Sequence, residues 1–244
     1  MTLKSIILIL VFIVRFIGVF SQEKINQFSS ENDTLWIKTK KMKGTGVFGF
    51  SGGYLEPQNI TDLFDYHIEY PDSLINISRV RLPVDIDSKL DYLDIITAQL
   101  PSGVEVVLVD QNNNQSFRDD TIYFLKPVEW YSHINSIPIT FLVSNGVDTI
   151  QSNSWIKIGN WNESIIYGRD EYLHASIIID DKFFEIGIID QTLSGSFTYG
   201  LNPEIALLSN EFGKKDSINI RDLIKKEEYL NLGGFYYKFD SINT

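Results

Sequence analysis

The chain has 244 residues, a formal net charge of −11 at pH 7 and no cysteine. An acidic chain repels phosphate backbones, which excludes nucleic acid as a partner, and the lack of cysteine excludes disulfides, thiol catalysis and cysteine-based metal sites. Hydrophobic residues make up 43% of the chain, enough for one large domain or two small ones.

Residues 1–21 have the layout of a signal peptide. Lys4 precedes an apolar stretch that ends at Phe20, and Ser21 stands before a polar chain. The apolar stretch is shorter than the roughly 20 residues of a bilayer span, and Arg15 near its middle disfavours a span further. We therefore expect a secreted or periplasmic protein with no stable membrane span after cleavage. Because no cysteine follows the cleavage point, we expect no lipid anchor.

Two glycine-rich motifs follow, and neither has the context that its chemistry requires. GTGVFG at 44–49 matches a dinucleotide-binding fingerprint, and GFSGG at 49–53 matches the nucleophile elbow of serine hydrolases. Both motifs need a strand before them and a helix after them, and neither neighbour is indicated here. We therefore expect that the protein is not an enzyme. A hydrolase that uses paired carboxylates stays open as the alternative.

Short runs of apolar and β-branched residues, bounded by Gly, Asn, Asp and Ser, recur along the chain. Such runs are typical of strands. The expected strands span 77–86, 94–100, 104–109, 121–125, 137–143, 154–158, 175–180, 182–189 and 204–208. This pattern predicts an all-β fold of antiparallel sandwich or barrel-like lobes with little helix.

Two stretches about 80 positions apart are similar to each other. The stretch 104–125 aligns with 184–208, and each has an apolar strand, an Asp-led polar loop and a second strand. The matched residues include Glu105 with Glu185, Asp110 with Asp190, Gln111 with Gln191, Ser116 with Ser196 and Phe117 with Phe197. The repeat predicts two related β units, which we place in a first lobe at 22–145 and a second lobe at 146–244.

The first of these loops is rich in oxygen-bearing side chains. Counted from Asp110, they stand at positions 1, 3, 5, 7, 10 and 11, and they are Asp110, Asn112, Asn114, Ser116, Asp119 and Asp120. Calcium takes six to eight oxygen ligands, and alternate residues of a tight loop can point several inward. The sequence therefore predicts a weak calcium site and no other cofactor. Gln115 stands where such loops favour glycine, and Thr121 stands where the EF-hand has glutamate.

The same loop has a second interpretation that needs no metal. Asn and Asp side chains accept hydrogen bonds from nearby backbone N–H groups in turns, and both tolerate left-handed backbone conformations. In that case Phe117 packs back on its hairpin. The aligned loop after Asp190 has Gly195 at the turn but fewer oxygen ligands, so it is the weaker calcium candidate.

Trp155 and Trp161 are the candidate ligand-binding residues. Together with Trp130 and Tyr131, they form a platform for sugar rings if they are exposed side by side. Aromatic side chains in strands more often belong to the core. Carbohydrate binding is therefore an alternative function.

The C-terminal region predicts two further elements. SINIRDLIKKEEYL at 217–230 favours a short helical turn near 221–227. YLNL and FYYKF, which flank a Gly-Gly pair within 229–239, favour a β-hairpin.

The segment at about 170–239 carries D-x-x-x-x-G-x-F at 190–197 and ends in LNLGGFYYKF at 230–239. With these motifs it resembles the β-rich region that precedes a thioredoxin-like domain in some secreted proteins of Bacteroidetes. The resemblance covers about a third of the chain and implies a β scaffold there. Redox activity in such proteins comes from a Cys-x-x-Cys motif, so the resemblance does not extend that activity to this chain.

These features together predict an exported, non-catalytic β-rich binding or accessory module with a weakly calcium-stabilised loop. Its partner would be a protein or glycan at the cell surface or in the periplasm. Two alternatives stay open, a carbohydrate-binding or adhesin-like protein and a hydrolase that uses paired carboxylates.

Overall fold

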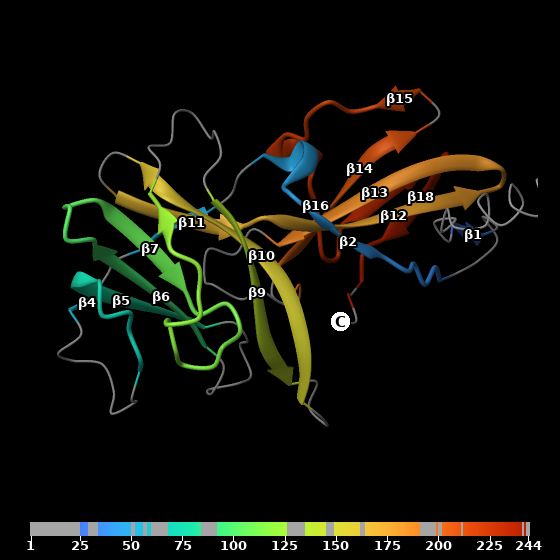
Figure 1. Ribbon diagram of the computed structural model, residues 1–244. Helices are drawn as coiled ribbons and strands as arrows, with labels where there is room; N and C mark the ends of the chain where they lie inside the picture. Colours follow the sequence, from blue (N-terminus) through green and yellow to red (C-terminus); the bar gives the residue numbers. More distant parts are fainter. Residues whose placement is uncertain are drawn as a thin grey trace, which may run out of the picture.

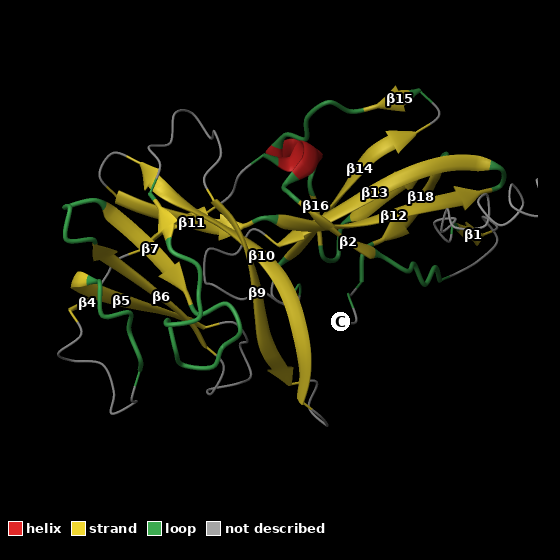
Figure 2. Ribbon diagram, viewed as in Figure 1, coloured by secondary structure: helices red, strands yellow, loops and turns green. Residues whose placement is uncertain are grey.

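The computed structural model describes residues 25–28, 34–49, 52–55, 58–59, 68–83, 92–125, 135–144, 149–161, 164–190, 199, 202–210, 212–240 and 242. Strands dominate this part of the chain (Figure 2), and its helical segments are two single 3-10 turns, η1 (Gly46–Phe48) and η3 (Ile220–Asp222). The predicted all-β fold with little helix is therefore confirmed. Among the described residues, no helix is long and apolar enough to cross a membrane.

A five-stranded antiparallel sheet lies at one end of the molecule (Figure 1). Its strands, in order across the sheet, are β4 (Gln58–Asn59), β5 (Ile75–Pro83), β6 (Tyr92–Gln99), β7 (Glu105–Val109) and β8 (Tyr123–Phe124). Each strand pairs with the next one along the chain. This sheet is therefore a meander.

A four-stranded antiparallel sheet packs against the meander. Its strands, in order, are β3 (Gly52–Leu55), β11 (Ser164–Arg169), β10 (Thr149–Trp161) and β9 (Asn135–Ser144). The two sheets enclose what we call the sandwich core, which includes Leu93, Ile95, Val107, Val109, Ile137, Ile139, Phe141, Ile156 and Ile158. This part of the fold is a β-sandwich.

A smaller apolar cluster covers the other face of the meander. This outer cluster consists of Ile68, Leu74, Ile96, Ala98, Val106, Leu108 and Phe117. Because side chains alternate along a strand, Val106 and Leu108 face the outer cluster while Val107 and Val109 face the sandwich core. Burial on both faces explains why residues 106–109 of β7 are all apolar.

A seven-stranded sheet forms the other end of the molecule (Figure 1). Its main path runs through β1 (Asn26–Phe28), β12 (Glu171–Ile179), β13 (Lys182–Asp190), β14 (Pro203–Asn210) and β15 (Gly213–Lys214), while β2 (Lys40–Lys43) pairs with β12 and β16 (Ile224–Lys225) pairs with β14. Only β1 pairs in parallel. The short strands β1, β2, β15 and β16 cover the edges of the sheet, which protects it from edge-to-edge pairing.

A second core lies on one face of this sheet. It includes Leu173, Ala175, Ile177, Ile179, Phe184, Ile186, Ile188, Tyr199, Ile205, Leu230 and Leu232. The strict alternation of buried and partly buried residues along β12 is what a strand with one core-facing side requires. Asp180 and Asp181, with φ of 46° and 63°, form the tight turn that joins β12 to β13.

The predicted C-terminal hairpin is confirmed. β17 (Tyr229–Leu232) pairs with β18 (Phe235–Lys238), and Gly233 and Gly234 connect them with φ of 67° and 100°. The helical turn predicted near 221–227 is wrong in place and extent. The only helical turn there is η3, and β16 follows it because Ile224 pairs with Ile205 of β14.

Asp170 joins the two ends of the molecule, since it lies between β11 and β12. Its N–H donates to the Trp155 carbonyl (2.8 Å), and its own carbonyl accepts from the Gly44 N–H (2.7 Å). Its carboxylate lies 2.8 Å from Lys157 Nζ, and both side chains are buried. A buried ion pair of this kind fixes geometry more than it adds stability.

The predicted lobe boundary falls at 145, between two strands that pair with each other, β9 and β10. β1 and β2, from the predicted first lobe, pair with β12 in the predicted second lobe. The division into 22–145 and 146–244 stays a prediction. The expected signal peptide, residues 1–21, lies outside the described residues.

Candidate functional site

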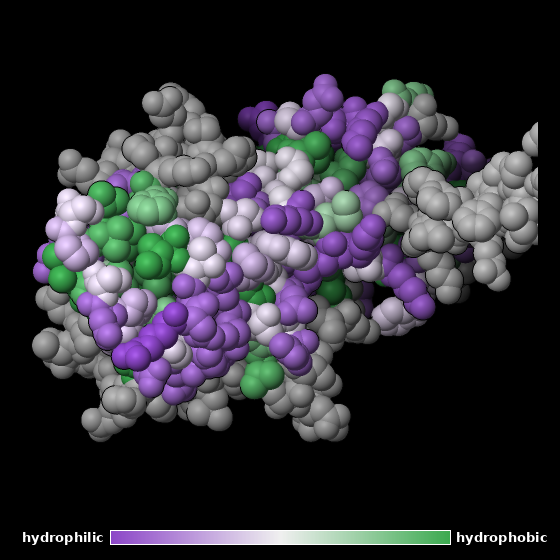
Figure 3. Space-filling model, viewed as in Figure 1, coloured by the Kyte–Doolittle hydropathy of each residue, from purple (hydrophilic) through white to green (hydrophobic). Residues whose placement is uncertain are grey.

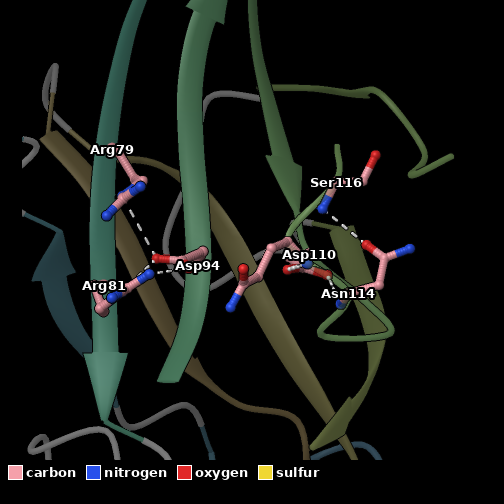
Figure 4. Close-up of polar contacts among 7 residues, drawn as sticks. Arg79, Arg81, Asp94, Asp110, Asn114 and Ser116 are labelled. Carbon is pink, nitrogen blue, oxygen red and sulfur yellow. Dashed lines mark hydrogen bonds and ion pairs between the residues drawn. The ribbon is translucent and has the colours of Figure 1, made fainter. Parts of the chain in front are cut away.

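Residues 110–120, which we call the polar loop, leave the buried end of β7 and lead toward β8. The loop begins at Asp110, which is fully buried. Asp110 Oδ1 accepts the Asn114 N–H (3.0 Å), and Oδ2 accepts the Gln115 N–H (2.8 Å) (Figure 4). Burial raises the pKa of Asp110, and these backbone hydrogen bonds oppose the rise. The first side chain of the predicted site therefore organises the turn.

The asparagines of the loop make the local turns that the metal-free interpretation predicts. Asn112 Oδ1 accepts the Asn114 N–H (3.2 Å), and Asn114 Oδ1 accepts the Ser116 N–H (2.8 Å). Asn113 and Gln115 have φ of 55° and 65°. Gln115 thus occupies the left-handed position that favours glycine, at a cost in backbone strain.

Two side chains of the predicted calcium site donate hydrogen bonds to a third, Asp119. Asn112 Nδ2 and Asn114 Nδ2 donate to Asp119 Oδ2 at 2.9 and 3.0 Å. The hydrogen bond from Asn112 is the largest cause of the lowered pKa of Asp119. The loop therefore holds an exposed, ionised carboxylate between two amide groups.

Asp120 lies behind Asp119 and is partly buried. Its Oδ1 accepts the Gln111 N–H (3.0 Å), while its buried Oδ2 has no hydrogen-bond partner. Burial and the nearby carboxylates of Asp110 and Asp119 raise the pKa of Asp120 to about 7, against the hydrogen bond from Gln111. The carboxylates of Asp110 and Asp119 thus lie close enough to repel that of Asp120.

Phe117 anchors the loop to the meander. Its side chain is fully buried in the outer cluster and stacks on Tyr70, with ring centroids 5.9 Å apart. Its N–H donates to the Glu69 carbonyl (2.8 Å). This is the packing that the metal-free interpretation expects for Phe117.

Gln111 ties the polar loop to the edge of the opposite sheet. Its carbonyl accepts the Thr140 N–H (2.7 Å), and its Nε2 donates to the Pro138 carbonyl (3.0 Å). Both partners lie on β9, the edge strand of the four-stranded sheet. The loop therefore closes one side of the sandwich.

A buried charge cluster lies beside the loop, and the sequence did not point to it. Arg81 Nε and Nη2 donate to Asp94 Oδ1 and Oδ2 at 2.8 and 2.7 Å, and Arg79 Nε lies 3.6 Å from Asp94 Oδ1 (Figure 4). The Asp94 carbonyl accepts the Asp110 N–H (2.9 Å). The only signal in the sequence is an R-x-R pattern in one strand with an aspartate in the next, and only the β5–β6 register pairs Arg81 with Asp94.

The two tryptophans of the predicted ligand site both lie on β10. Trp155 is partly buried, and the side chain of Trp161 lies outside the described residues. Six residues of strand separate them by roughly 20 Å, which is too far for one sugar ring to contact both. Their role in carbohydrate binding stays a prediction.

The second polar loop lies mostly outside the described residues, including Gly195 and Phe197. Its first residue, Asp190, is buried at the end of β13, as Asp110 is buried at the end of β7. Asp190 is opposite Pro203 in the pairing of β13 with β14.

Among the described residues, no group of three or more His, Asp or Glu is arranged to hold a metal ion. A cation at the polar loop would therefore need amide or backbone oxygens beside its carboxylates, which calcium accepts. Figure 3 shows that hydrophilic residues cover much of this face of the molecule, with an apolar patch at the end that holds the meander.

Comparison of the chain with protein families, curated proteins and solved structures found no match.

Proposed function

We propose that the protein is an exported, non-catalytic β-rich binding or accessory module in which the polar loop takes up a calcium ion. The observation that carries the calcium proposal is the convergence of Asn112 and Asn114 on Asp119, next to a turn organised by the Asp110 carboxylate. A cation at Asp119 would displace the two amide nitrogens, and the Asn112 and Asn114 side chains would turn to present their oxygens, which accept backbone N–H groups in the metal-free loop.

The charges of the loop also favour a cation. Burial raises the pKa of Asp120, and the nearby carboxylates of Asp110 and Asp119 raise it further. A divalent cation removes this repulsion, because opposite charge favours the ionised form of each carboxylate. With few carboxylate ligands, the site would be weak and suited to an extracellular calcium concentration.

Calcium at this loop would act on the sandwich as a whole. Gln111 is held between Asp120 of the loop and Thr140 of β9. A cation that orders the loop would therefore order the contact between the two sheets. The expected role is stabilisation of a binding scaffold outside the cell.

Thermal unfolding tests the proposal. Calcium at millimolar concentration should raise the Tm of the wild-type protein, and EDTA should reverse the change, because a ligand that binds only the folded state stabilises it. Asp119→Asn should abolish the response, since it removes the charge but keeps the size of the side chain and an oxygen that accepts the two amide hydrogen bonds.

Asp216→Asn is the matched control, because Asp216 is an exposed aspartate between β15 and η3, outside the polar loop. It should leave the calcium response unchanged. A wild-type Tm that is the same in calcium and in EDTA would contradict the proposal.

A further inference from the structure

The hairpin of β17 and β18 covers the second core with one face only. Leu230, Leu232 and Tyr237 point inward and belong to that core or pack against it. Gly234 N–H donates to Asn231 Oδ1 (2.9 Å), which fixes the turn at the tip. The hairpin is therefore a rigid ribbon with a solvent-facing side.

Two tyrosines lie on the solvent-facing side. Tyr229 is 60% exposed and Tyr236 is 70% exposed. Tyr229 is opposite Lys238 and Asn231 is opposite Tyr236, so all four side chains share one face of the hairpin. Diagonal neighbours in such a pair lie about 7 to 8 Å apart, so the two tyrosines occupy neighbouring positions on this face.

The polar groups beside the rings supply hydrogen-bond donors, and the charge of the one cationic donor, Lys238, is compensated. Lys238 forms an ion pair with Glu227, which cancels its charge. Asn231 uses its oxygen at the turn, which leaves its amide nitrogen as a donor on the exposed face. The face combines aromatic surface with hydrogen-bond donors.

The exposed aromatic area of this face indicates the size of ligand that it fits. An aromatic side chain offers about 150 to 250 Å², so the exposed parts of two rings offer roughly 200 to 330 Å². The two rings supply less than half of the roughly 800 Å² that each partner contributes to a stable protein interface. One or two sugar rings need far less, and their apolar faces and hydroxyl groups match aromatic rings flanked by donors.

We propose that the exposed face of the β17–β18 hairpin, formed by Tyr229, Asn231, Tyr236 and Lys238, binds neutral sugar rings. The Tyr229 and Tyr236 rings stack on the sugars, and Asn231 and Lys238 donate to their hydroxyl groups. This site goes beyond the calcium proposal and is independent of it, because the hairpin packs on the second core and the polar loop on the meander.

Titration calorimetry with cellotetraose, xylotetraose, mannotetraose and chitotetraose tests this proposal on the exported chain. We expect at least one of them to bind and the double variant Tyr229→Ala/Tyr236→Ala to weaken its affinity by about tenfold or more. Tyr229→Phe/Tyr236→Phe should keep most of the affinity, because the ring faces remain.

Tyr54→Ala is the matched control, because Tyr54 is 63% exposed on β3. It should leave the affinity unchanged. The proposal is overturned if none of the four oligosaccharides binds, or if the double alanine variant binds as the wild type does while its circular dichroism spectrum shows that it is folded. A change in oligomeric state caused by the double variant would instead identify a second copy of the chain as the occupant.

Discussion

The hairpins β7–β8 and β13–β14 have similar sequences but different surroundings. In both, an apolar strand ends in a buried aspartate, Asp110 or Asp190, and the chain returns in an antiparallel strand. Val106 and Leu108 face the outer cluster, and the aligned residues of β13, Ile186 and Ile188, face the second core. On this side the two strands are equivalent.

The opposite side of each strand is covered differently. Val107 lies in the sandwich core under a whole second sheet. The aligned residue of β13 is Gly187, and a Cβ there would lie 2.5 Å from the ring of Phe48, which comes from η1 and packs on Tyr172 with ring centroids 5.4 Å apart. One aromatic ring therefore takes the place that a sheet occupies in the first hairpin.

The comparison indicates that a glycine in an apolar strand can mark a place where another side chain packs closely on that strand. A glycine weakens a strand and often marks a place where another group approaches the backbone closely. The substitution of glycine for valine within otherwise matching strands thus marks the point where the two halves of the molecule diverge. Substitutions at the covering residues test this comparison.

Phe117→Ala should have the largest effect. The side chain is fully buried in the outer cluster, so its loss should lower the free energy of unfolding by about 3 to 5 kcal/mol. Phe48→Ala should cost clearly less, because Phe48 is only partly buried. Urea denaturation of both variants measures the difference. Equal losses in the free energy of unfolding would contradict the view that the two strands are covered differently.

Asp110→Ala should lower the free energy of unfolding by about 2 to 4 kcal/mol in EDTA. The variant removes two charge-assisted hydrogen bonds to backbone N–H groups, which together contribute about 3 to 6 kcal/mol. Removal of the buried charge of Asp110 offsets part of this loss. Urea denaturation provides the measurement. A loss below about 0.5 kcal/mol, the range of ordinary surface substitutions, would mean that the carboxylate does not organise the loop.

Gly187→Val should cost about 1 to 3 kcal/mol, because the added side chain overpacks against Phe48. The same substitution should cost less in a Phe48→Ala background, where the ring is absent. A double-mutant cycle measures this coupling. Additive losses would show that the ring does not occupy the place of the missing side chain.

The smallest expected effect is a pH dependence from Asp120. Its folded pKa of about 7 lies above the ordinary pKa of an aspartate, so the folded state holds this proton more tightly than the unfolded state. The stability from this group is full below about pH 4 and is lost as the pH rises through 7. Asp120→Asn should flatten the fall in Tm between about pH 4 and pH 7 in EDTA, and an unchanged pH profile would contradict the assignment.

Local patterns predicted the strands and the turns well. The apolar runs around Val107 and Ile188 became central strands, and the Gly-Gly pair at 233–234 became a hairpin turn. The polar loop also followed its sequence, because Asn112 and Asn114 bond to backbone groups only two residues away. These features depend on short-range spacing, which a sequence displays directly.

Contacts between distant segments were beyond such patterns. Gln111 meets β9 across the sandwich, and Arg81 meets Asp94 through a strand register that no local motif encodes. The helical turn predicted near 221–227 failed for the same reason, since pairing with β14 draws Ile224 into a strand. Long-range pairing overrides local propensity at these positions.

A crystal structure determined in millimolar calcium tests the central claim most directly. We predict an ion bound by Asp110, Asp119 and the amide oxygens of Asn112 and Asn114, with oxygen distances of about 2.3 to 2.6 Å. If Asn112 and Asn114 still donate to Asp119 and no ion lies among these side chains, the polar loop is a hydrogen-bonded turn and the calcium proposal is wrong.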